Sequence, residues 1–368
     1  MEDRTIRAAV CHAFGAPLSV EEVRLRAPRA GEVEVDLEAC AICHSDIHAA
    51  EGAWGGYLPA VYGHEAAGRV TRVGPGVQGL APGDAVVVTL IRACGHCACC
   101  AGGAPTACET PRDPRDTPLR ALGGTSLGQG MATGAFAEAL VVHESQLCTI
   151  PDDMGMEAAS LLACGVITGA GAVFNTAAMP AGATALVIGA GGVGLNTVQG
   201  ARIAGARRVI AMDMNDDKLA AAAEFGATDG VLATDPEARA KVQALTGGRG
   251  ADYVFVTVGA IGAYQSALSF AARQGSVIMV GMPESGAQMT LEPVNVAYYA
   301  QTLKGSLMGA AVLRRDIPML VDLYQQGRLK LDELISERWE LAQINEAIAD
   351  TIAGRARRNV LHFGGRAP

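Results

Sequence analysis

The spacing of apolar and polar residues divides the chain into two parts of different texture. The first 165 residues predict mostly β-structure. Val33, Val35 and Leu37 alternate there with acidic residues, which is the pattern of a half-buried strand. Residues 101–135 are rich in Gly, Pro and Thr and predict loops. A β-rich first domain is therefore expected.

From about residue 166, short apolar strands alternate with helical stretches. The expected order is strand 184–188, helix 192–204, strand 208–212, helix 216–225, strand 253–258, helix 263–272 and strand 276–280. Strands that alternate with helices imply right-handed crossovers and a parallel, doubly wound sheet, so the fold class is α/β. A helix near 316–326 and a last strand over 359–363 can return to the first part.

Size and composition exclude several classes of protein. The 368 residues suffice for two domains, and half of them are hydrophobic. No apolar run approaches the length that crosses a bilayer, and the acidic start lacks the features of a signal peptide. The net charge of −9 argues against nucleic acid as a partner. We therefore expect a cytoplasmic protein without a membrane or nucleic-acid partner.

A glycine-rich run follows the expected strand 184–188 and opens the expected helix 192–204. Its spacing fits the dinucleotide-binding motif G-x-G-x-x-G, in which the first glycine permits a tight turn, the second lets backbone approach a pyrophosphate, and the third lets helix and strand pack closely. The helix N-terminus offers free N–H groups to the phosphates. The residues predicted to bind the cofactor are Gly189, Gly191, Gly192, Val193 and Gly194.

An acidic residue stands where the motif requires one. Asp213 ends the next expected strand, 19 residues after Gly194. A carboxylate there accepts hydrogen bonds from the adenosine ribose hydroxyls and repels a 2′-phosphate, which favours NAD over NADP. The alternative is that Asp213 is the N-cap of the helix over 216–225, a role that Asp216 can also take.

Four cysteines within 15 residues predict a closed zinc site. Cys94, Cys97, Cys100 and Cys108 supply four soft ligands, enough for a tetrahedral structural ion. Such an ion would stabilise a loop that has no hydrophobic core of its own. Cys99 and His96 are interpreted as non-ligands, because adjacent thiols cannot easily point at one metal.

Three separated residues could hold a second, open metal site. They are Cys43 in C-H-S-D-I-H, His64 in G-H-E and Cys164 in C-G-V-I-T-G. Two thiolates and an imidazole bind zinc and leave a fourth position vacant, as catalytic sites do. The alternative is three unrelated residues, since buried cysteine often behaves as a small hydrophobic side chain.

In this order, the motifs resemble those of the zinc-dependent medium-chain alcohol dehydrogenases, of the dimeric type near the glutathione-dependent formaldehyde and aryl-alcohol dehydrogenase branches. The match runs from G-H-E-A-A-G at 63–68 to R-R-N-V-L-H-F at the end. The resemblance implies a GroES-like catalytic zinc domain over 1–165 and 308–368, with an NAD-binding Rossmann domain over 166–307. It also implies a homodimer joined through the Rossmann sheets.

The resemblance assigns chemistry to the open site. Zinc on Cys43, His64 and Cys164 would act as a Lewis acid while an alcohol becomes an aldehyde or ketone and a hydride passes reversibly to NAD. With the cysteine cluster this makes two zinc ions per chain. Four neighbours match further roles of the family: Asp46 orients the histidine ligand, Glu65 approaches the zinc, and a proton relay runs from Ser45 through a cofactor hydroxyl to His48. For Glu65 the alternative is an ordinary salt-bridge partner.

The resemblance also indicates cofactor and substrate contacts, each of which could instead have a surface or packing role. His44 and Arg358 match pyrophosphate partners, Lys218 a contact near the ribose, and Thr168 a residue packed on the nicotinamide. The residues expected to line an apolar alcohol pocket are Trp54, Leu90, Met282 and Leu307. Such a pocket suits an aromatic, terpenoid or medium-chain primary alcohol.

Two other functions stay open. Arg112 stands where glutathione-dependent formaldehyde dehydrogenases carry an arginine for the glutathione carboxylate, although those enzymes have an acidic residue where this chain has Trp54. Arg112 could equally be a solvated loop charge. The second alternative is an inactive relative that binds zinc and nucleotide, but the ligand and relay residues that such a protein would lose are all present.

Overall fold

The computed structural model describes residues 2–364, which form two compact units. Unit 1 comprises the chain up to Cys164, Val312–Gln325 and the chain from Leu331. Unit 2 comprises Gly165–Ala311 and Gln326–Lys330. The divisions fall close to the domain limits expected from the sequence. Two short segments that were expected in the catalytic domain, residues 308–311 and Gln326–Lys330, belong to unit 2 instead.

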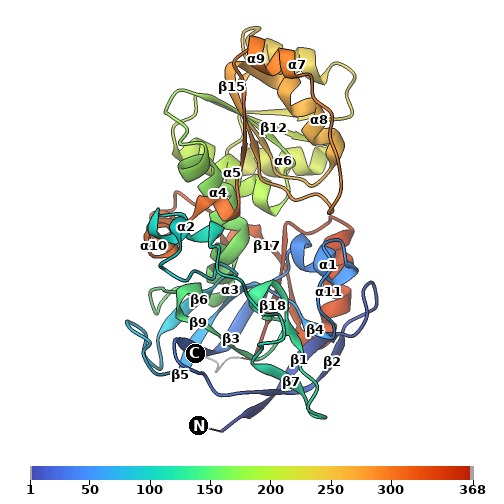
Figure 1. Cartoon of the computed structure of the whole chain (residues 1–368). Coiled ribbons are helices and arrows are strands. Elements are labelled where there is room, and N and C mark those ends of the chain that lie inside the picture. The colour runs from blue at the N-terminus through green and yellow to red at the C-terminus, as the bar shows by residue number, and fades with distance from the viewer. Residues whose placement is uncertain (1, 365–368) are drawn as a thin grey trace. The chain divides into compact units, whose positions relative to one another are not determined.

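Unit 2 is a six-stranded parallel sheet with helices between the strands (Figure 1). The strands lie in the order β13-β12-β11-β14-β15-β16, as expected for a Rossmann fold. Their bounds are β11 Thr184–Ile188, β12 Arg208–Asp213, β13 Asp229–Leu232, β14 Ala251–Val256, β15 Ala271–Met279 and β16 Thr302–Gly305. The helices are α5 Gly192–Ile203, α6 Asp216–Glu224, α7 Ala238–Leu245, α8 Ile261–Phe270 and α9 Pro293–Tyr298.

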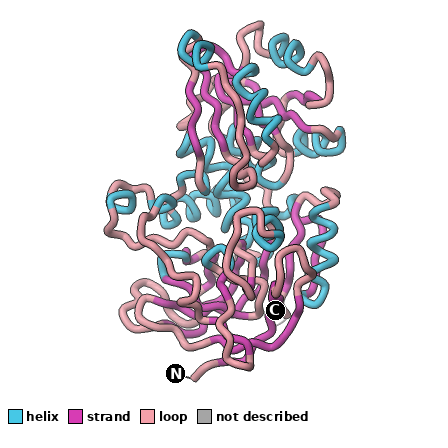
Figure 2. The backbone as a smooth tube through the Cα atoms, turned by 45° about the vertical axis from the view of Figure 1, so that its right-hand side comes forward, coloured by secondary structure: helices cyan, strands magenta, loops and turns pink. Residues whose placement is uncertain are grey.

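The regular structure of unit 1 consists mainly of strands, which form two sheets (Figure 2). The five-stranded sheet has the order β7 (Leu119–Ala121), β2 (Ser19–Leu25), β1 (Arg4–Cys11), β4 (Ala60–Val61), β8 (Gly128–Gln129). The second sheet has the order β10 (Leu147–Thr149), β6 (Ala85–Val88), β5 (Glu65–Val73), β3 (Glu32–Ala41), β18 (Arg358–His362), β17 (Ile335–Glu340), with β9 (Ala139–His143) also on β3. The helices of this unit include α1 His44–Glu51, α2 Ala98–Ala101, α10 Leu313–Gln325 and α11 Ile344–Ile352. Since β18 pairs with β3, the tail does return to the first part of the chain.

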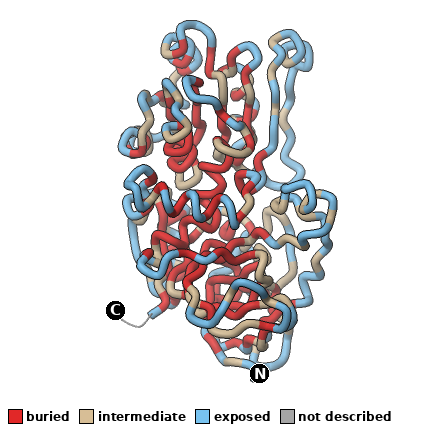
Figure 3. The backbone as a smooth tube through the Cα atoms, turned by 90° about the vertical axis from the view of Figure 1, so that its left-hand side faces the viewer, coloured by how far each residue is buried: buried red, intermediate tan, exposed pale blue. Residues whose placement is uncertain are grey.

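The apolar side chains of both sheets form one core within unit 1. In Figure 3 the residues of these strands are largely coloured as buried. Among the largest fully buried side chains of this core are Leu25, Leu119, Phe136 and Leu140. Leu119 and Phe136 lie in and just after the segment 101–135, which also holds β7, β8 and two single turns of 3₁₀ helix, Pro105–Ala107 and Gly130–Ala132. This segment is therefore not all loop, although its regular elements are very short.

One residue of β3 departs from the predicted alternation. Glu34 was expected on a solvated face, but its side chain is fully buried. Arg4 Nη1 lies 2.7 Å from Glu34 Oε1, and Arg72 Nε donates to Oε2 at 2.7 Å. The two guanidiniums compensate the buried carboxylate, which a period-two pattern does not anticipate.

A long apolar helix was missed. Met156–Thr176 is helical over 21 residues with a mean hydropathy of 1.6, so an apolar stretch of membrane-spanning length does exist. It comprises α3 Met156–Leu161, a π segment Leu162–Val166, α4 Ile167–Gly171 and a second π segment Ala172–Thr176. Because 89% of its most apolar window is buried inside the protein, it is a core helix. The division between the units falls within it.

Candidate metal centres and cofactor site

Unit 1 brings Cys43, His64 and Cys164 together from three distant parts of the chain. Cys43 is the N-cap of α1, His64 directly precedes β5, and Cys164 lies in the first π segment of the long helix. The candidate ligand atoms of these residues and of Glu65 all lie within 4.8 Å of one another. π segments inside α-helices occur frequently at functional sites.

Asp46 fixes the orientation of the His64 ring. His64 Nδ1 donates to Asp46 Oδ1 at 2.8 Å, and the backbone N–H of Gly63 donates to the same oxygen at 2.9 Å. Both side chains are buried. His64 Nε2 has no hydrogen-bond partner among the residues that the structure describes. A buried nitrogen without a partner, with its opposite nitrogen held by a carboxylate, is the arrangement of a metal-ligating histidine.

The two thiols of this cluster compete for protons. The hydrogen bond from the Cys164 thiol, against the opposing effect of burial, holds the pKa of Cys43 well below its usual range. The same bond and burial raise the pKa of Cys164 well above its usual range. Two thiolates side by side in an apolar interior repel each other unless a cation compensates them. The donor set therefore fits a zinc ion on Cys43, His64 and Cys164.

Glu65 is a salt-bridge partner of Arg358 and also lies among the candidate ligands, while its approach to the zinc stays a prediction. Its carboxylate is fully buried within the cluster. Arg358 Nη2 lies 2.6 Å from Glu65 Oε1, and Arg358 also donates to the backbone oxygen of Ile42 at 3.3 Å. Burial raises the pKa of Glu65 to about 7, although the Arg358 charge opposes this. Arg358 was expected to bind pyrophosphate, and its pairing with Glu65 was missed because the two are far apart in sequence.

The predicted relay residues lie on α1. Ser45 is in the first turn, where its backbone N–H donates to Cys43 Sγ at 3.5 Å. His48 follows one turn later; its side chain is 43% exposed, and its Nδ1 lies 3.7 Å from Glu51 Oε2. Positions three apart on a helix share a face. The helix thus places Ser45 beside the metal cluster and gives His48 access to solvent.

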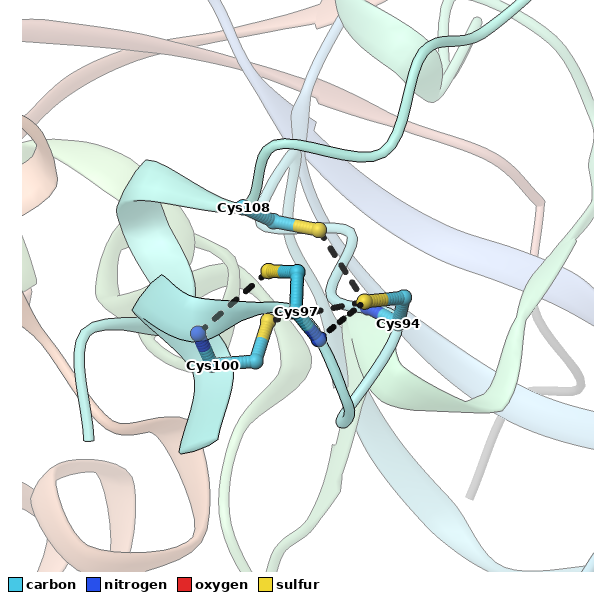
Figure 4. Close-up of side chains that lie close together, drawn as sticks. All are labelled: Cys94, Cys97, Cys100 and Cys108. Atoms are coloured by element: carbon cyan, nitrogen blue, oxygen red, sulfur yellow. Dashed lines mark hydrogen bonds between the residues drawn. The ribbon is translucent and has the colours of Figure 1, made fainter. Parts of the chain in front are cut away.

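The second cluster forms as the cysteine spacing predicts (Figure 4). The Sγ atoms of Cys94, Cys97, Cys100 and Cys108 all lie within 4.8 Å of one another. Backbone N–H groups donate to them: Cys97 N to Cys94 Sγ at 3.3 Å, Cys100 N to Cys97 Sγ at 3.4 Å, and Cys94 N to Cys108 Sγ at 3.4 Å. Backbone donors of this kind stabilise negatively charged sulfur.

A hydrogen bond with Thr110, together with backbone N–H groups, lowers the pKa of Cys94 to about 5, as suits a metal thiolate.

Two neighbouring residues that could also bind a metal, Cys99 and His96, stay outside this cluster. Cys99 lies on α2, but it is not among the four converging sulfurs. His96 is exposed, and its Nδ1 lies 2.9 Å from the backbone oxygen of Cys94. Neither Cys99 nor His96 joins the set of ligand atoms.

In unit 2 the three motif glycines have three different surroundings. Gly189 has φ +97°, and a Cβ on it would lie 2.5 Å from Val258. A Cβ on Gly194 would lie 1.8 Å from the backbone oxygen of Gly189, so strand and helix pack there without room for a side chain. A Cβ on Gly191, the N-cap of α5, would meet nothing within 4 Å. This open space at a helix N-terminus fits a pyrophosphate.

Asp213 forms a hydrogen bond with the same glycine turn. Its Oδ2 accepts from the backbone N–H of Ala190 at 2.7 Å, and its Oδ1 from that of Asn215 at 3.2 Å. The alternative of a helix cap on Asp213 or Asp216 is wrong, because Asn215 is the N-cap of α6 and accepts from the N–H of Asp217. Thr257, which sequence reasoning missed, donates to the oxygens of Ile188 and Gly189 at 3.0 and 2.9 Å. Its place after β14, next to the motif strand, was the available signal.

The other predicted cofactor contacts are divided between the units. Lys218 lies half-buried on α6. Thr168 is buried on α4, where its Oγ1 lies 3.6 Å from Met308 Sδ. His44 is exposed at the start of α1 and, like Arg358, belongs to unit 1. Their contribution to one cofactor site stays a prediction.

The predicted pocket residues are divided in the same way. Trp54 packs on the core of unit 1, with its ring centroid 6.0 Å from that of His48, and Leu90 is half-buried. Met282 and Leu307 are exposed residues of unit 2. A common pocket lined by all four residues also stays a prediction.

Arg112 is not a solvated loop charge. Its Nη2 donates to Gln129 Oε1 at 2.5 Å, and its Nε is buried without a partner among the described residues. Burial, reinforced by the charge of Arg92, lowers the pKa of Arg112 to about 10. Gln129 in turn donates to the backbone oxygens of Thr133 and Val141, both at 2.9 Å. Nothing in the spacing of the sequence pointed to Gln129.

Comparisons with known proteins agree with this arrangement. The family described as "Alcohol dehydrogenase GroES-like domain" matches residues 29–152, and "Zinc-binding dehydrogenase" matches residues 192–326. An NDMA-dependent alcohol dehydrogenase of Amycolatopsis methanolica is 38% identical over 371 residues, which cover 96% of this chain and 98% of that protein.

Two further relatives cover nearly the whole chain. An S-(hydroxymethyl)glutathione dehydrogenase of Paracoccus denitrificans is 35% identical, covering 97% of this chain and 99% of that protein. The crystal structure of benzyl alcohol dehydrogenase from Acinetobacter calcoaceticus superposes with a TM-score of 0.92 at 27% identity, covering 99% of this chain and 100% of the other. Together with the two family matches, this likeness shows that the chain is an enzyme and belongs to the zinc-dependent medium-chain alcohol dehydrogenases.

Proposed function

We propose that this enzyme oxidises a primary alcohol of aromatic, terpenoid or medium-chain type to the aldehyde, reversibly, with transfer of a hydride to NAD. The observation that carries the proposal is the convergence of Cys43, His64 and Cys164, with His64 Nε2 buried and free of hydrogen bonds from the described residues. When bound by these three residues, zinc would act as a Lewis acid toward the substrate oxygen. The same donor set is ill suited to a purely structural ion, because it leaves a fourth position open.

The surrounding residues prepare this site for the reaction. Asp46 accepts a hydrogen bond from Nδ1 of His64, which fixes the orientation of the ring and leaves Nε2 as the ligand nitrogen. Ser45 and His48, linked through a ribose hydroxyl of the cofactor, would give the alcohol proton a path to solvent. Asp213 keeps a carboxylate beside the glycine turn, which supports NAD as the cofactor.

We also propose two zinc ions per chain, one in each cluster. The four sulfurs of Cys94, Cys97, Cys100 and Cys108 complete a tetrahedral set without any other ligand, as structural zinc sites do. The ten cysteines, all within the described residues, form no disulfide, which supports work in the reducing cytoplasm.

The proposed assembly is a homodimer joined through unit 2. Strand β16 is the edge of the parallel sheet, and the segment before it exposes apolar side chains: Leu291 is 44% exposed, Val294 70% and Tyr298 68%. An open sheet edge with exposed apolar neighbours favours pairing with a second copy. We expect no nucleic-acid or membrane partner.

The second candidate function is oxidation of S-(hydroxymethyl)glutathione. The relative from Paracoccus denitrificans supports it, as does the partly buried guanidinium of Arg112. Two observations favour the first candidate: Gln129 already occupies one edge of Arg112, and Trp54 presents an apolar ring next to His48. The benzyl alcohol dehydrogenase among the structural relatives points in the same direction.

The substrate assignment is tested by comparing kcat/KM for benzyl alcohol and S-(hydroxymethyl)glutathione with NAD. We expect benzyl alcohol to be preferred at least about tenfold, because an apolar pocket cannot compensate the charges of glutathione. A preference for S-(hydroxymethyl)glutathione that Arg112→Ala abolishes would establish the second candidate. Two zinc ions per chain without turnover on a broad panel of alcohols would indicate an inactive relative.

Cofactor preference is tested by Asp213→Gly. The substitution removes the carboxylate that repels a 2′-phosphate, so the ratio of kcat/KM with NADP to that with NAD should rise at least about tenfold, which is about 1.4 kcal/mol. Asp216→Gly, at an exposed residue in the first turn of α6, is the matched control and should leave the ratio unchanged. An unaltered ratio in Asp213→Gly removes the assignment.

Zinc content after single substitutions tests the cysteine cluster. Cys100→Ser should lower the zinc content from about two ions to about one per chain and lower the unfolding temperature, because a structural site needs all four ligands. Cys99→Ser, at the neighbouring thiol, should keep both ions. Elemental analysis of the purified variants decides the matter, and equal zinc contents in the two variants would contradict the ligand assignment.

A further inference from the structure

An acidic residue, Glu51, is the last residue of α1 and lies three positions after His48. Glu51 Oε2 lies 3.7 Å from His48 Nδ1, and both side chains are partly exposed to solvent. This distance is too long for a hydrogen bond, but it is an ion-pair distance when the imidazole ring is protonated. Among the described residues, Glu51 has no other ion-pair partner. The carboxylate of Glu51 therefore interacts with the predicted relay histidine.

The stability of α1 does not explain an acidic residue at this position. The carbonyl groups at the end of a helix carry partial negative charge, which repels a carboxylate in the last turn and attracts a cation. Gly52, with φ +87°, ends the helix, and its N–H donates to the backbone oxygens of His48 and Ala49. This cap fixes the backbone of the last turn without the side chain of Glu51. The contact between Glu51 and His48 therefore calls for a different explanation.

The ring of His48 has an aromatic neighbour as well as an acidic one. The ring centroid of Trp54 lies 6.0 Å from that of His48, and the two planes meet at 63°. Trp54 packs on the core of unit 1, so it restricts the space into which the histidine ring can turn. The carboxylate of Glu51 lies near Nδ1. A negative charge there favours a proton on Nδ1 and leaves Nε2 to accept an incoming proton.

Other titratable groups surround α1 without pairing with His48. Helix α11 and the turn Gly130–Ala132 pack on α1, and the loop 12–16 contacts its end (Figure 1). The turn has no titratable residue. Within residues 2–364, Glu51 is the only carboxylate at ion-pair distance from His48. The other titratable residues of these elements are Glu346 and His44, which are exposed, Asp350, which pairs with Arg355, His12, which lies 3.4 Å from Glu21, and Asp46, which contacts His64.

We propose that Glu51 is a positioning residue of the proton relay, which orients Nδ1 of His48 and stabilises the positive charge of the ring while it carries the alcohol proton. This inference rests on the proposed alcohol oxidation and on the role of His48 in it. As the hydride passes to NAD, the alcohol proton arrives at Nε2. The ring then carries two protons, releases the one on Nδ1 to water beside Glu51, and becomes neutral again. Reduction of an aldehyde follows the same steps in reverse.

The test is the pH dependence of kcat/KM for Glu51→Gln, measured for oxidation of benzyl alcohol with NAD and for reduction of benzaldehyde with NADH. A nearby carboxylate favours the protonated ring, so the ring of the variant should lose its proton at lower pH. Because the pair is partly exposed, we expect both pH profiles to move by about 0.3 unit toward acid. Oxidation below the midpoint should become about twofold faster, and reduction above the midpoint about twofold slower.

Four controls show whether Glu51 acts through its charge and through His48. Glu51→Asp keeps the charge and should keep most of the wild-type profile. Glu22→Gln, at an exposed residue of β2, should change nothing. In a His48→Gln background, Glu51→Gln should have no further effect, because residues that act through one another are not additive. At about 1 M salt, which screens charges beyond about 3 Å, the wild-type profile should approach that of Glu51→Gln.

Three outcomes would overturn the inference while the proposed function stands. They are wild-type profiles in Glu51→Gln, an equal loss of rate in both directions, which indicates a structural defect, and an equal effect of Glu51→Gln with and without His48. An unchanged pH profile in His48→Gln would contradict the relay itself, and absence of turnover on a panel of alcohols would contradict the proposed function. The inference would fall with either of them, and the wild-type enzyme and His48→Gln reveal these failures separately.

Discussion

Two sulfurs and one imidazole nitrogen converge in a buried part of unit 1, and this convergence places a physical demand on everything around it. The thiols of Cys43 and Cys164 share a proton, because both cannot carry a negative charge without a compensating cation. Asp46 holds the opposite side of the His64 ring, and Arg358 neutralises Glu65 beside it. The cluster is therefore a set of groups that a divalent ion stabilises and that apolar packing alone would not.

The helices of unit 1 restrict the positions of two of these ligands. Cys43 is the N-cap of α1, so the helix that carries Ser45 and His48 begins directly after this ligand. The π segment around Cys164 departs from regular helical geometry at that ligand. In unit 2 the corresponding constraint is steric, since neither Gly189 nor Gly194 has room for a Cβ while Gly191 does. Charge compensation therefore governs the metal cluster of unit 1, and close packing of backbone governs the glycine turn of unit 2.

Much of this could be predicted because it follows local rules. The parallel sheet of unit 2, the glycine turn and the cysteine cluster each arise from short spacings, and the observed strands β11, β12 and β14 lie within a few residues of their predicted positions. Strand β13 and helix α7 were missed because they are short and mix polar with apolar residues.

The remaining features depend on contacts between distant segments. The pairing of Arg358 with Glu65, the burial of Glu34 between two arginines, and the bond between Arg112 and Gln129 join residues that no local pattern connects. The family resemblance supplied the catalytic ligand set, since spacing alone could not show that Cys43, His64 and Cys164 meet. The helix over Met156–Thr176 shows the limit of hydropathy, because its apolar length reflects burial in the protein core.

Anomalous diffraction at the zinc absorption edge, from crystals of the enzyme purified without added metal, tests the central claim most directly. The account predicts a peak about 2.3 Å from the sulfurs of Cys43 and Cys164 and about 2.1 Å from His64 Nε2. A second peak is expected among Cys94, Cys97, Cys100 and Cys108. A peak in the four-cysteine cluster alone, with none at Cys43, His64 and Cys164 in a fully active preparation, would contradict the account.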